Sequence, residues 1–254
     1  MKETTMKDDL GDRMKLYESH DETILDISMP IVIRIDGKRF SKFTSKMKKP
    51  FDNDMTELMI KTTASLIKET HAHVAYTQSD EITLVFMPKD GRTNIMFEGR
   101  VQKTTSVFAS MTSAFFIRHG ARFIDDKSTP FFDCRMFNVP NINEVSNSLV
   151  WRIADARRNS VSSAYRYTLG HSKMQNLSVT EMSSELESTQ HPLSSYDPKF
   201  RFGTIMTRVT ADISAPDSFE EILRTTIRAQ PANIFLSSMH SDRVKFLENA
   251  VNKL

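Results

Sequence analysis

Acidic residues stand at two places where a predicted strand ends or turns. Asp36 follows the β-branched run at residues 30–35, and Asp80-Glu81 separates two apolar runs at 74–78 and 82–86 that predict a hairpin. If the first strand pairs beside that hairpin, the carboxylates lie close together. Magnesium needs only one or two carboxylates and completes its shell with water and substrate phosphates. The pattern therefore predicts a site for two magnesium ions that promotes phosphoryl transfer.

A basic loop follows Asp36 directly. It contains six cationic side chains and no acid, namely Lys38, Arg39, Lys42, Lys46, Lys48 and Lys49. Cations in this place would neutralise the charge that spreads over a transferring phosphoryl group. Gly37, before the loop, lets the backbone approach a metal or phosphate closely. A triphosphate clamp is one interpretation of the loop, and a solvated lysine loop is the other.

Plainer interpretations also exist for the other candidates. Taken singly, Asp36-Gly37 fits an ordinary turn, and residues 79–81 fit a polar hairpin tip. Two more basic groups lie on predicted helices, Arg100 with Lys103 and Arg152 with Arg157 and Arg158. Spacing of three and four residues is typical of a solvated helix face, and it also fits a surface for a polyanion.

The elements that position these residues follow one order: strand, helix, strand, strand, helix, strand. Asp52 or Asp54 is expected to cap the first helix, and the second, from residue 101, ends near His119-Gly120. A strand at 132–137 completes a ferredoxin-like α+β pattern, an antiparallel sheet covered by helices. We predict a single domain, 1–254, with its core at about 28–140. Residues 141–254 are expected to form a helical and loop-rich extension, with partly mobile loop at 171–210 and a helix near 240–252.

Composition limits the function classes further. The net charge of +2 is too small to indicate a nucleic-acid partner by itself. One cysteine, Cys134, excludes an internal disulfide and makes a cysteine-based zinc site implausible. The sequence has no stretch of the length and hydrophobicity that a secretion signal or membrane span needs. We expect a cytoplasmic protein without membrane contact.

Several motifs occur together at separations that are specific for one family. They are Arg34-Ile35-Asp36-Gly37 with Phe40 and Phe43, Lys49-Pro50, and residues 75–81 (AYTQSDE) followed by Phe86. Weaker agreement comes from Arg100 and Lys103, Phe132-Asp133-x-Arg135, and Trp151-Arg152-x-Ala154-Asp155. With these motifs the chain resembles the tRNA-histidine guanylyltransferase family, which includes the guanylyltransferase-like 3′-to-5′ RNA polymerases. The similarity extends from about residue 28 to 165.

The resemblance implies a palm-like core of the kind found in polymerases and nucleotide cyclases, two magnesium ions and a homotetramer. The metal would be held by Asp36, Asp80 and the carbonyl of Gly37, with Glu81 and Lys49 also in catalytic roles. The residues implied to bind nucleotide are Asp36, Gly37, Lys38, Arg39, Phe40, Ser41, Ser79, Asp80, Arg100 and Lys103. The residues expected to bind RNA are Arg152, Arg157 and Asn159.

The implied reaction adds a nucleotide to the 5′ end of tRNA with ATP and GTP as substrates. One departure separates this chain from the founding eukaryotic members, because Arg157-Arg158-Asn159-Ser160 stands where they have His-Ile-Asn-Asn. We therefore expect templated repair of 5′-truncated tRNA and keep guanylate addition to tRNA-His as the alternative. A nucleotide cyclase on a palm fold and a non-catalytic RNA-binding protein are the rivals from other classes.

Overall fold

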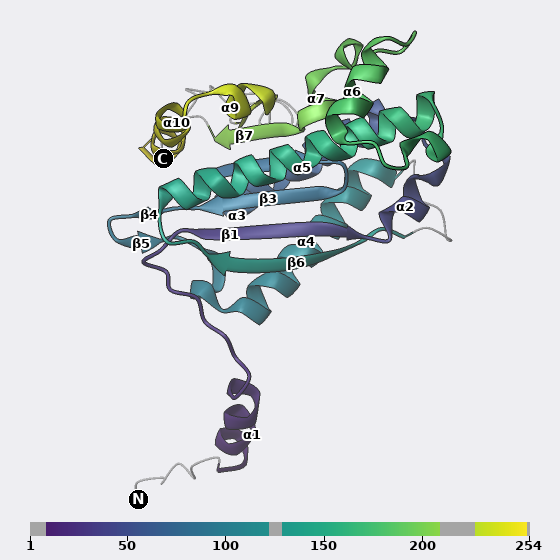
Figure 1. The fold of residues 1–254 in the computed structure, drawn as a ribbon. Coiled ribbons are helices and arrows are strands. Elements are labelled where there is room, and N and C mark those ends of the chain that lie inside the picture. Colours follow the sequence, from purple (N-terminus) through teal and green to yellow (C-terminus); the bar gives the residue numbers. More distant parts are fainter. Residues whose placement is uncertain (1–8, 122–128, 209–226, 253–254) are drawn as a thin grey trace, which may run out of the picture.

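The structure is a computed structural model that describes residues 9–121, 129–208 and 227–252 (Figure 1). Its centre is a six-stranded antiparallel sheet with the strand order β6-β1-β3-β2-β7-β8. These strands are β1 (Ile31–Lys38), β2 (Val74–Gln78), β3 (Glu81–Phe86), β6 (Phe131–Asn138), β7 (Thr204–Arg208) and β8 (Ile227–Pro231). The longer helices are α1 (Asp9–Ser19), α3 (Asn53–Thr70), α4 (Val101–Gly120), α5 (Ile142–Thr168), α6 (Val179–Glu187) and α10 (His240–Asn252).

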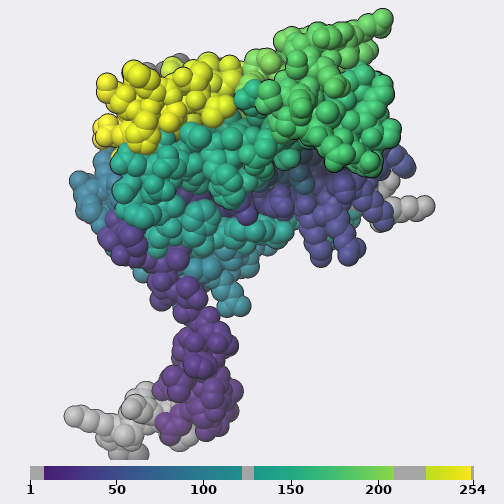
Figure 2. Space-filling model, in the orientation of Figure 1, coloured from purple at the N-terminus to yellow at the C-terminus, as the bar shows by residue number. Residues whose placement is uncertain are grey.

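Short elements join these parts. They are α2 (Phe40–Phe43), η1 (Thr44–Lys46), β4 (Pro88–Lys89), β5 (Arg92–Thr93), η2 (Met96–Gly99), η4 (His171–Met174), η5 (Leu193–Ser195), α7 (Pro198–Phe202) and α9 (Asn233–Ser237). In Figures 1 and 2, α1 projects from the body of the molecule, and none of its residues is buried. Within the described residues, no helix has the length and hydrophobicity needed to cross a bilayer.

The predicted ferredoxin-like order is confirmed. The elements β1, α3, β2, β3, α4 and β6 follow one another along the chain, and their strands pair in the order β6-β1-β3-β2. The prediction of a helix cap is also correct, because the Asp52 side chain accepts a hydrogen bond from Met55 N at 3.0 Å. Sequence signals at strand ends and helix caps were therefore enough to fix the core topology.

Alternation along β1 separates the two faces of the sheet. Ile31, Ile33 and Ile35 belong to a core cluster with residues of α3 and α4, whereas Val32 belongs to a second cluster with residues of α5 and α10. Successive side chains of a strand point to opposite faces, so Arg34 and Asp36 share the face of Val32. The acid at the end of β1 therefore lies on the side of the sheet that α5 covers.

The C-terminal half contributes to the sheet and to the cover of its second face. Residues 171–210 were expected to be partly mobile loop, and among the described ones are also the helices α6 and α7 and the strand β7, which pairs with β2 in the sheet. A capping box between Ser178 and Glu181 starts α6. In addition, α5 packs on the second face of the sheet and buries it. The polar composition concealed short amphipathic elements, each of which buries only a few side chains.

A buried histidine gives a first testable prediction. His73 is 6% exposed, its Nδ1 accepts a hydrogen bond from Met87 N at 3.2 Å, and burial lowers its pKa from 6.5 to about 4. The folded state therefore keeps the ring neutral while the unfolded chain takes up a proton below pH 6.5. We expect the free energy of unfolding to fall by about 2 kcal/mol between pH 7 and pH 5 from this group alone.

The measurement is urea unfolding at both pH values. His73→Asn should lose that part of the pH dependence, because an amide oxygen can accept the same bond without titrating. His171→Asn, at an exposed histidine, is the control and should keep the wild-type dependence. An unchanged pH dependence in His73→Asn would contradict the assignment.

Candidate functional site

Antiparallel pairing brings the predicted acids together. Asp36, near the end of β1, lies opposite Glu81 at the start of β3 and opposite Asp133 on β6. Asp80 occupies the turn before β3, and its carbonyl accepts a hydrogen bond from Gly37 N at 3.1 Å. The expected proximity of the first strand to the hairpin tip is confirmed. Asp133, whose register position on β6 could not be read from the sequence, adds a third strand to this acidic end of the sheet.

Gly37 is required by the packing at the end of β1. A Cβ atom at this position would lie 2.3 Å from the Phe40 ring. Phe40 is 3% exposed and packs against the rings of Phe43, Phe116 and Phe132. A side chain at residue 37 would therefore force this aromatic cluster apart. The cluster fixes the path of the chain directly after Asp36.

Burial and mutual repulsion set the charge state of the two central acids. Burial, followed by the charge of Asp36, raises the pKa of Asp80 to about 6. Burial and the charge of Asp133 likewise raise the pKa of Asp36. Within the described part of the chain, neither carboxylate forms an ion pair. Two hard oxygen donors whose charge is uncompensated fit a divalent cation, which would relieve the repulsion.

Glu81 is held differently. Its carboxylate accepts two hydrogen bonds from the Arg152 guanidinium on α5, at 2.7 and 2.6 Å, and the two side chains are only 14% and 13% exposed. Arg152 also donates to Asp155 at 2.9 Å. Burial raises the pKa of Glu81, while Arg152 opposes that shift. Arg152, which was predicted to bind RNA, pairs with Glu81 and thereby links α5 to the acidic end of the sheet.

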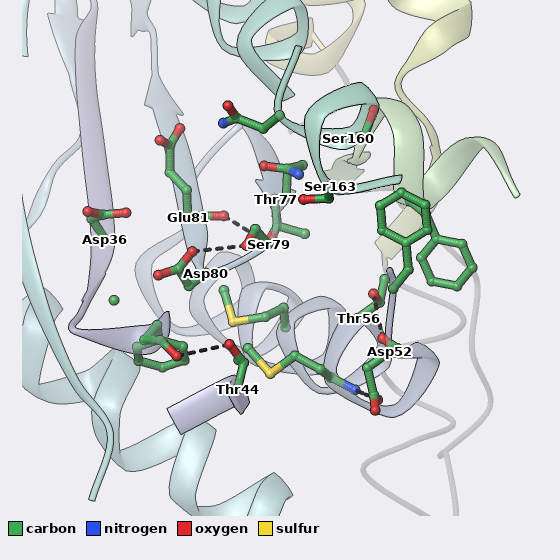
Figure 3. A pocket seen from close by; sticks show the side chains of 18 of the residues that line it. Asp36, Thr44, Asp52, Thr56, Thr77, Ser79, Asp80, Glu81, Ser160 and Ser163 are labelled. Carbon is green, nitrogen blue, oxygen red and sulfur yellow. Dashed lines mark hydrogen bonds between the residues drawn. The ribbon is translucent and has the colours of Figure 1, made fainter. Parts of the chain in front are cut away.

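A cleft of about 880 Å³ opens at these carboxylates. Figure 3 shows Asp36 and Asp80 facing the same space, with Thr44 and Asp52 on one side and Ser160 and Ser163 of α5 on the other. The acids that line the cleft are Asp36, Asp52, Asp80 and Glu81. They are outnumbered by its basic residues, Arg34, Arg39, Lys48, Lys49, Arg135, Arg152 and Lys199. The cleft thus pairs a cation-binding end with walls suited to a polyphosphate.

Most of the predicted site residues line this cleft. They are Asp36, Gly37, Arg39, Phe40, Ser41, Lys49, Ser79, Asp80, Glu81, Arg152 and Asn159. Lys38 and Arg157 are exposed and do not line it. The basic loop is folded into α2 and η1, which lie at one end of the cleft. Within it, Lys49 Nζ donates a hydrogen bond to the Thr44 carbonyl at 3.1 Å.

Arg100 and Lys103, which were predicted to bind nucleotide, do not line this cleft. Arg100 forms an ion pair with Glu22 and a β-bridge with Ile24, beyond the start of β1. Lys103 lies over the Phe97 ring, 4.9 Å from its centroid. The topology explains this position: β3 begins at the acids and runs away from them, so α4, which follows it, must start at the opposite end of the sheet.

Sequence reasoning missed a group of cleft residues that come from distant segments. Lys199 of α7 forms an ion pair with Glu57 at 2.8 Å, and Phe200 stacks on Phe51 with ring planes 3° apart and centroids 5.4 Å apart. Arg34, Arg135 and Trp151 line the wall beside Asp36. Residues 199 and 200 fall in the region expected to be loop, so no local signal marked them.

Comparisons with known proteins agree with this site. A family model described as tRNAHis guanylyltransferase matches residues 11–140. An uncharacterised protein of Acanthamoeba polyphaga mimivirus is 31% identical over 222 residues, which cover 78% of this chain and 76% of that protein. The tRNA(His) guanylyltransferase of Saccharomyces cerevisiae is 28% identical over 160 residues, 58% of this chain and 64% of the yeast protein. The chain thus spans less than two thirds of that enzyme.

Solved structures cover more of the chain. A bacterial tRNA(His) guanylyltransferase-like protein in complex with ATP has a TM-score of 0.79 and 28% identity, and it covers 95% of this chain and 99% of its own. A bacterial tRNA(His) guanylyltransferase-like protein in complex with GTP has a TM-score of 0.71 and 26% identity, and it covers 96% of this chain and 99% of its own. The Saccharomyces cerevisiae enzyme, at 22% identity, a TM-score of 0.66 and coverage of 82% and 97%, shares the fold.

The Glu81–Arg152 pair yields a second prediction. Arg152→Gln leaves the buried Glu81 carboxylate without its cation, so we expect a loss of about 3 kcal/mol or more in the free energy of unfolding. Arg158→Gln is a matched control, because Arg158 pairs with Asp155 from an exposed position, with 52% of its side chain accessible. It should cost less than about 1 kcal/mol.

Chemical denaturation measures both variants, and the double variant Glu81→Gln/Arg152→Met should recover most of the loss. Equal losses in the free energy of unfolding for Arg152→Gln and Arg158→Gln would show that the buried Glu81–Arg152 pair stabilises the fold no more than an exposed pair does.

Proposed function

The chain belongs to the tRNAHis guanylyltransferase family, a family of nucleotidyltransferases, and from this premise we propose that it adds nucleotides to the 5′ end of tRNA with ATP and GTP as substrates. The observation that carries the proposal is the pair of uncompensated carboxylates, Asp36 and Asp80, at the end of a cleft lined by basic side chains. The ATP and GTP complexes of the bacterial relatives support nucleotide binding.

A nucleotidyltransferase of this family implies a divalent metal ion. We propose two magnesium ions, held by the carboxylates of Asp36 and Asp80 and the carbonyl of Gly37. No cluster of three or more histidine, cysteine, aspartate or glutamate side chains suited to a metal occurs among the described residues. Magnesium is usually bound by one or two carboxylates and completes its shell with water and substrate phosphates. When bound, the ions neutralise the attacking and leaving oxygens of a phosphoryl displacement.

The reaction proceeds in two stages in this proposal. A 5′-phosphate oxygen of the RNA first attacks the α-phosphorus of ATP, and pyrophosphate leaves. The 3′-hydroxyl of GTP then attacks the activated 5′-phosphorus, and AMP leaves with the electron pair of the broken P–O bond. Arg39, Lys48, Lys49 and Lys199 stand in the cleft wall, where they neutralise and orient the triphosphate. Arg152 acts as a positioning residue through Glu81.

We assign the chain to the polymerase-like branch, which performs templated repair of 5′-truncated tRNA. Two observations support this assignment. The chain keeps Asn159 of the His-Ile-Asn-Asn motif, with Ser160 beside it in the cleft, but has Arg157 and Arg158, which are exposed outside the cleft, at the first two positions. The bacterial guanylyltransferase-like protein also fits this chain better than the yeast enzyme does, with TM-scores of 0.79 and 0.66.

Three further parts of the proposal rest on the family resemblance and the sequence. They are assembly as a homotetramer, a cytoplasmic location, and a single domain in which residues 141–254 extend a catalytic core at about 28–140. Arg100 and Lys103 lie at the other end of the sheet, so we propose no contact between them and the nucleotide in the cleft of their own chain.

The test is transfer of labelled GTP, in the presence of ATP and magnesium, to a 5′-monophosphorylated tRNA that lacks its first residue. Asp36→Asn and Asp80→Asn should each reduce the rate about a hundredfold or more, because several kcal/mol of transition-state charge stabilisation is lost. Asp90→Asn is the matched control: Asp90 lies in the β4–β5 turn with φ +54°, a conformation that asparagine tolerates.

The same assay separates the rivals. Template-matched extension supports the repair reaction, whereas guanylate addition only to full-length tRNA-His would move the chain to the other branch. A cyclic product from nucleotide alone would indicate a cyclase. RNA binding that survives removal of magnesium, with no product on any RNA, would indicate a binding protein. Full activity of either aspartate variant would overturn the metal site.

A further inference from the structure

An open strip of sheet lies beside α5 and includes Asp36. On β6 the side chains of Phe131, Asp133 and Arg135 are exposed at 57%, 55% and 52%, and on β1 Lys38 is exposed and Arg34 partly so. Pairing places Phe131 opposite Lys38 and Arg135 opposite Arg34 on the face that α5 shares. Figure 1 shows α5 in front of the sheet with β1 and β6 visible below it. We call this surface the β1–β6 strip.

Trp151 forms the wall of the strip on the α5 side. It is 50% exposed, it lines the same cleft as Asp36, and the guanidinium carbons of Arg34 and Arg152 lie 5.4 and 4.6 Å from its ring centroid. Trp151 thus presents a half-exposed aromatic ring to the cleft. The two guanidinium groups near the ring suit a planar, electron-rich ligand.

The charges on the strip favour a polyanion. The strip carries three cations, Lys38, Arg34 and Arg135, and two acids: Asp133, which pairs with Arg135 at 3.1 Å, and Asp36, which the proposed function assigns to the metal. Exposed aromatic rings on a ferredoxin-like sheet stack on unpaired bases, and each stacked base contributes through its π-face whatever its sequence. Neighbouring cations then hold the phosphates. This combination fits single-stranded RNA better than the apolar face of a second protein.

We propose that the β1–β6 strip binds an unpaired segment of the RNA substrate, with a base stacked on Trp151. The inference rests on the proposed function and deepens it. An RNA whose 5′ end is recessed leaves the opposite strand unpaired at the point where nucleotides are added. Asp36 lies within the strip, between Arg34 and Lys38 and opposite Asp133, so an unpaired strand stacked along the strip passes the carboxylates and holds the recessed 5′ end near them. Trp151 is a positioning residue for the template.

The chain offers an internal probe of this contact, because Trp151 is its single tryptophan. The experiment titrates the protein, without magnesium, with an RNA hairpin that carries an unpaired 3′ overhang and with the same hairpin made blunt. Stacking of a base quenches tryptophan fluorescence. We expect quenching by the overhang hairpin and little by the blunt one or by GTP alone.

Variants test whether the contact contributes to affinity. Trp151→Ala should weaken binding of the overhang hairpin about tenfold, in line with the loss of one stacked base, while Trp151→Phe should retain most of the affinity. Tyr167→Ala is the matched control, since Tyr167 is a 55% exposed aromatic of the same helix that does not line the cleft. Binding of GTP should be unchanged in Tyr167→Ala, which lies outside the cleft.

The outcomes distinguish this inference from the proposed function. If the wild-type protein extends a recessed RNA but shows no quenching, and Trp151→Ala binds as Tyr167→Ala does, the strip is not a template site although the enzyme assignment stands. A change in sedimentation of Trp151→Ala with unchanged RNA affinity would identify the strip as an interface between copies of the chain. Failure to extend any RNA would instead refute the proposed function.

Discussion

The antiparallel pairing of β1 with β3 forces three carboxylates, Asp36, Asp80 and Glu81, into one small and partly buried volume. Arg152 neutralises Glu81 and thereby fixes α5 over this end of the sheet. Asp36 and Asp80 keep uncompensated charge, which burial makes costly and which raises both pKa values. The rest of the site depends on how this negative charge is balanced. The balance determines the position of α5, the wall of the cleft and the preference for a hard cation.

The core topology could be predicted because its signals are local. Asp52 caps α3, and the tip at Asp80-Glu81 separates two strand-like runs, so neighbours along the chain define each element. The cleft wall could not be predicted in the same way, because Lys199 and Trp151 reach it only through tertiary packing. The correct position of Arg100 was, however, implicit in the predicted order of strands, since a helix that follows β3 must begin far from the acids.

The four residues that stand in place of the His-Ile-Asn-Asn motif lie on α5. Asn159 and Ser160 line the cleft, whereas Arg157 and Arg158 are exposed outside it. Ser160 also donates hydrogen bonds to the carbonyls of Arg157 and Arg201, so it ties α5 to α7. The substitution therefore changes one wall of the cleft and leaves the metal-binding end intact. A change of substrate with conserved chemistry is the consequence that this arrangement favours.

Anomalous scattering from crystals that contain Mn²⁺ and a non-hydrolysable GTP analogue tests the central claim most directly. The account predicts manganese between the carboxylates of Asp36 and Asp80, with the triphosphate extending toward Lys49 and Lys199 and with Glu81 still paired to Arg152. Manganese bound elsewhere, or a triphosphate seated away from the two aspartates, would contradict it.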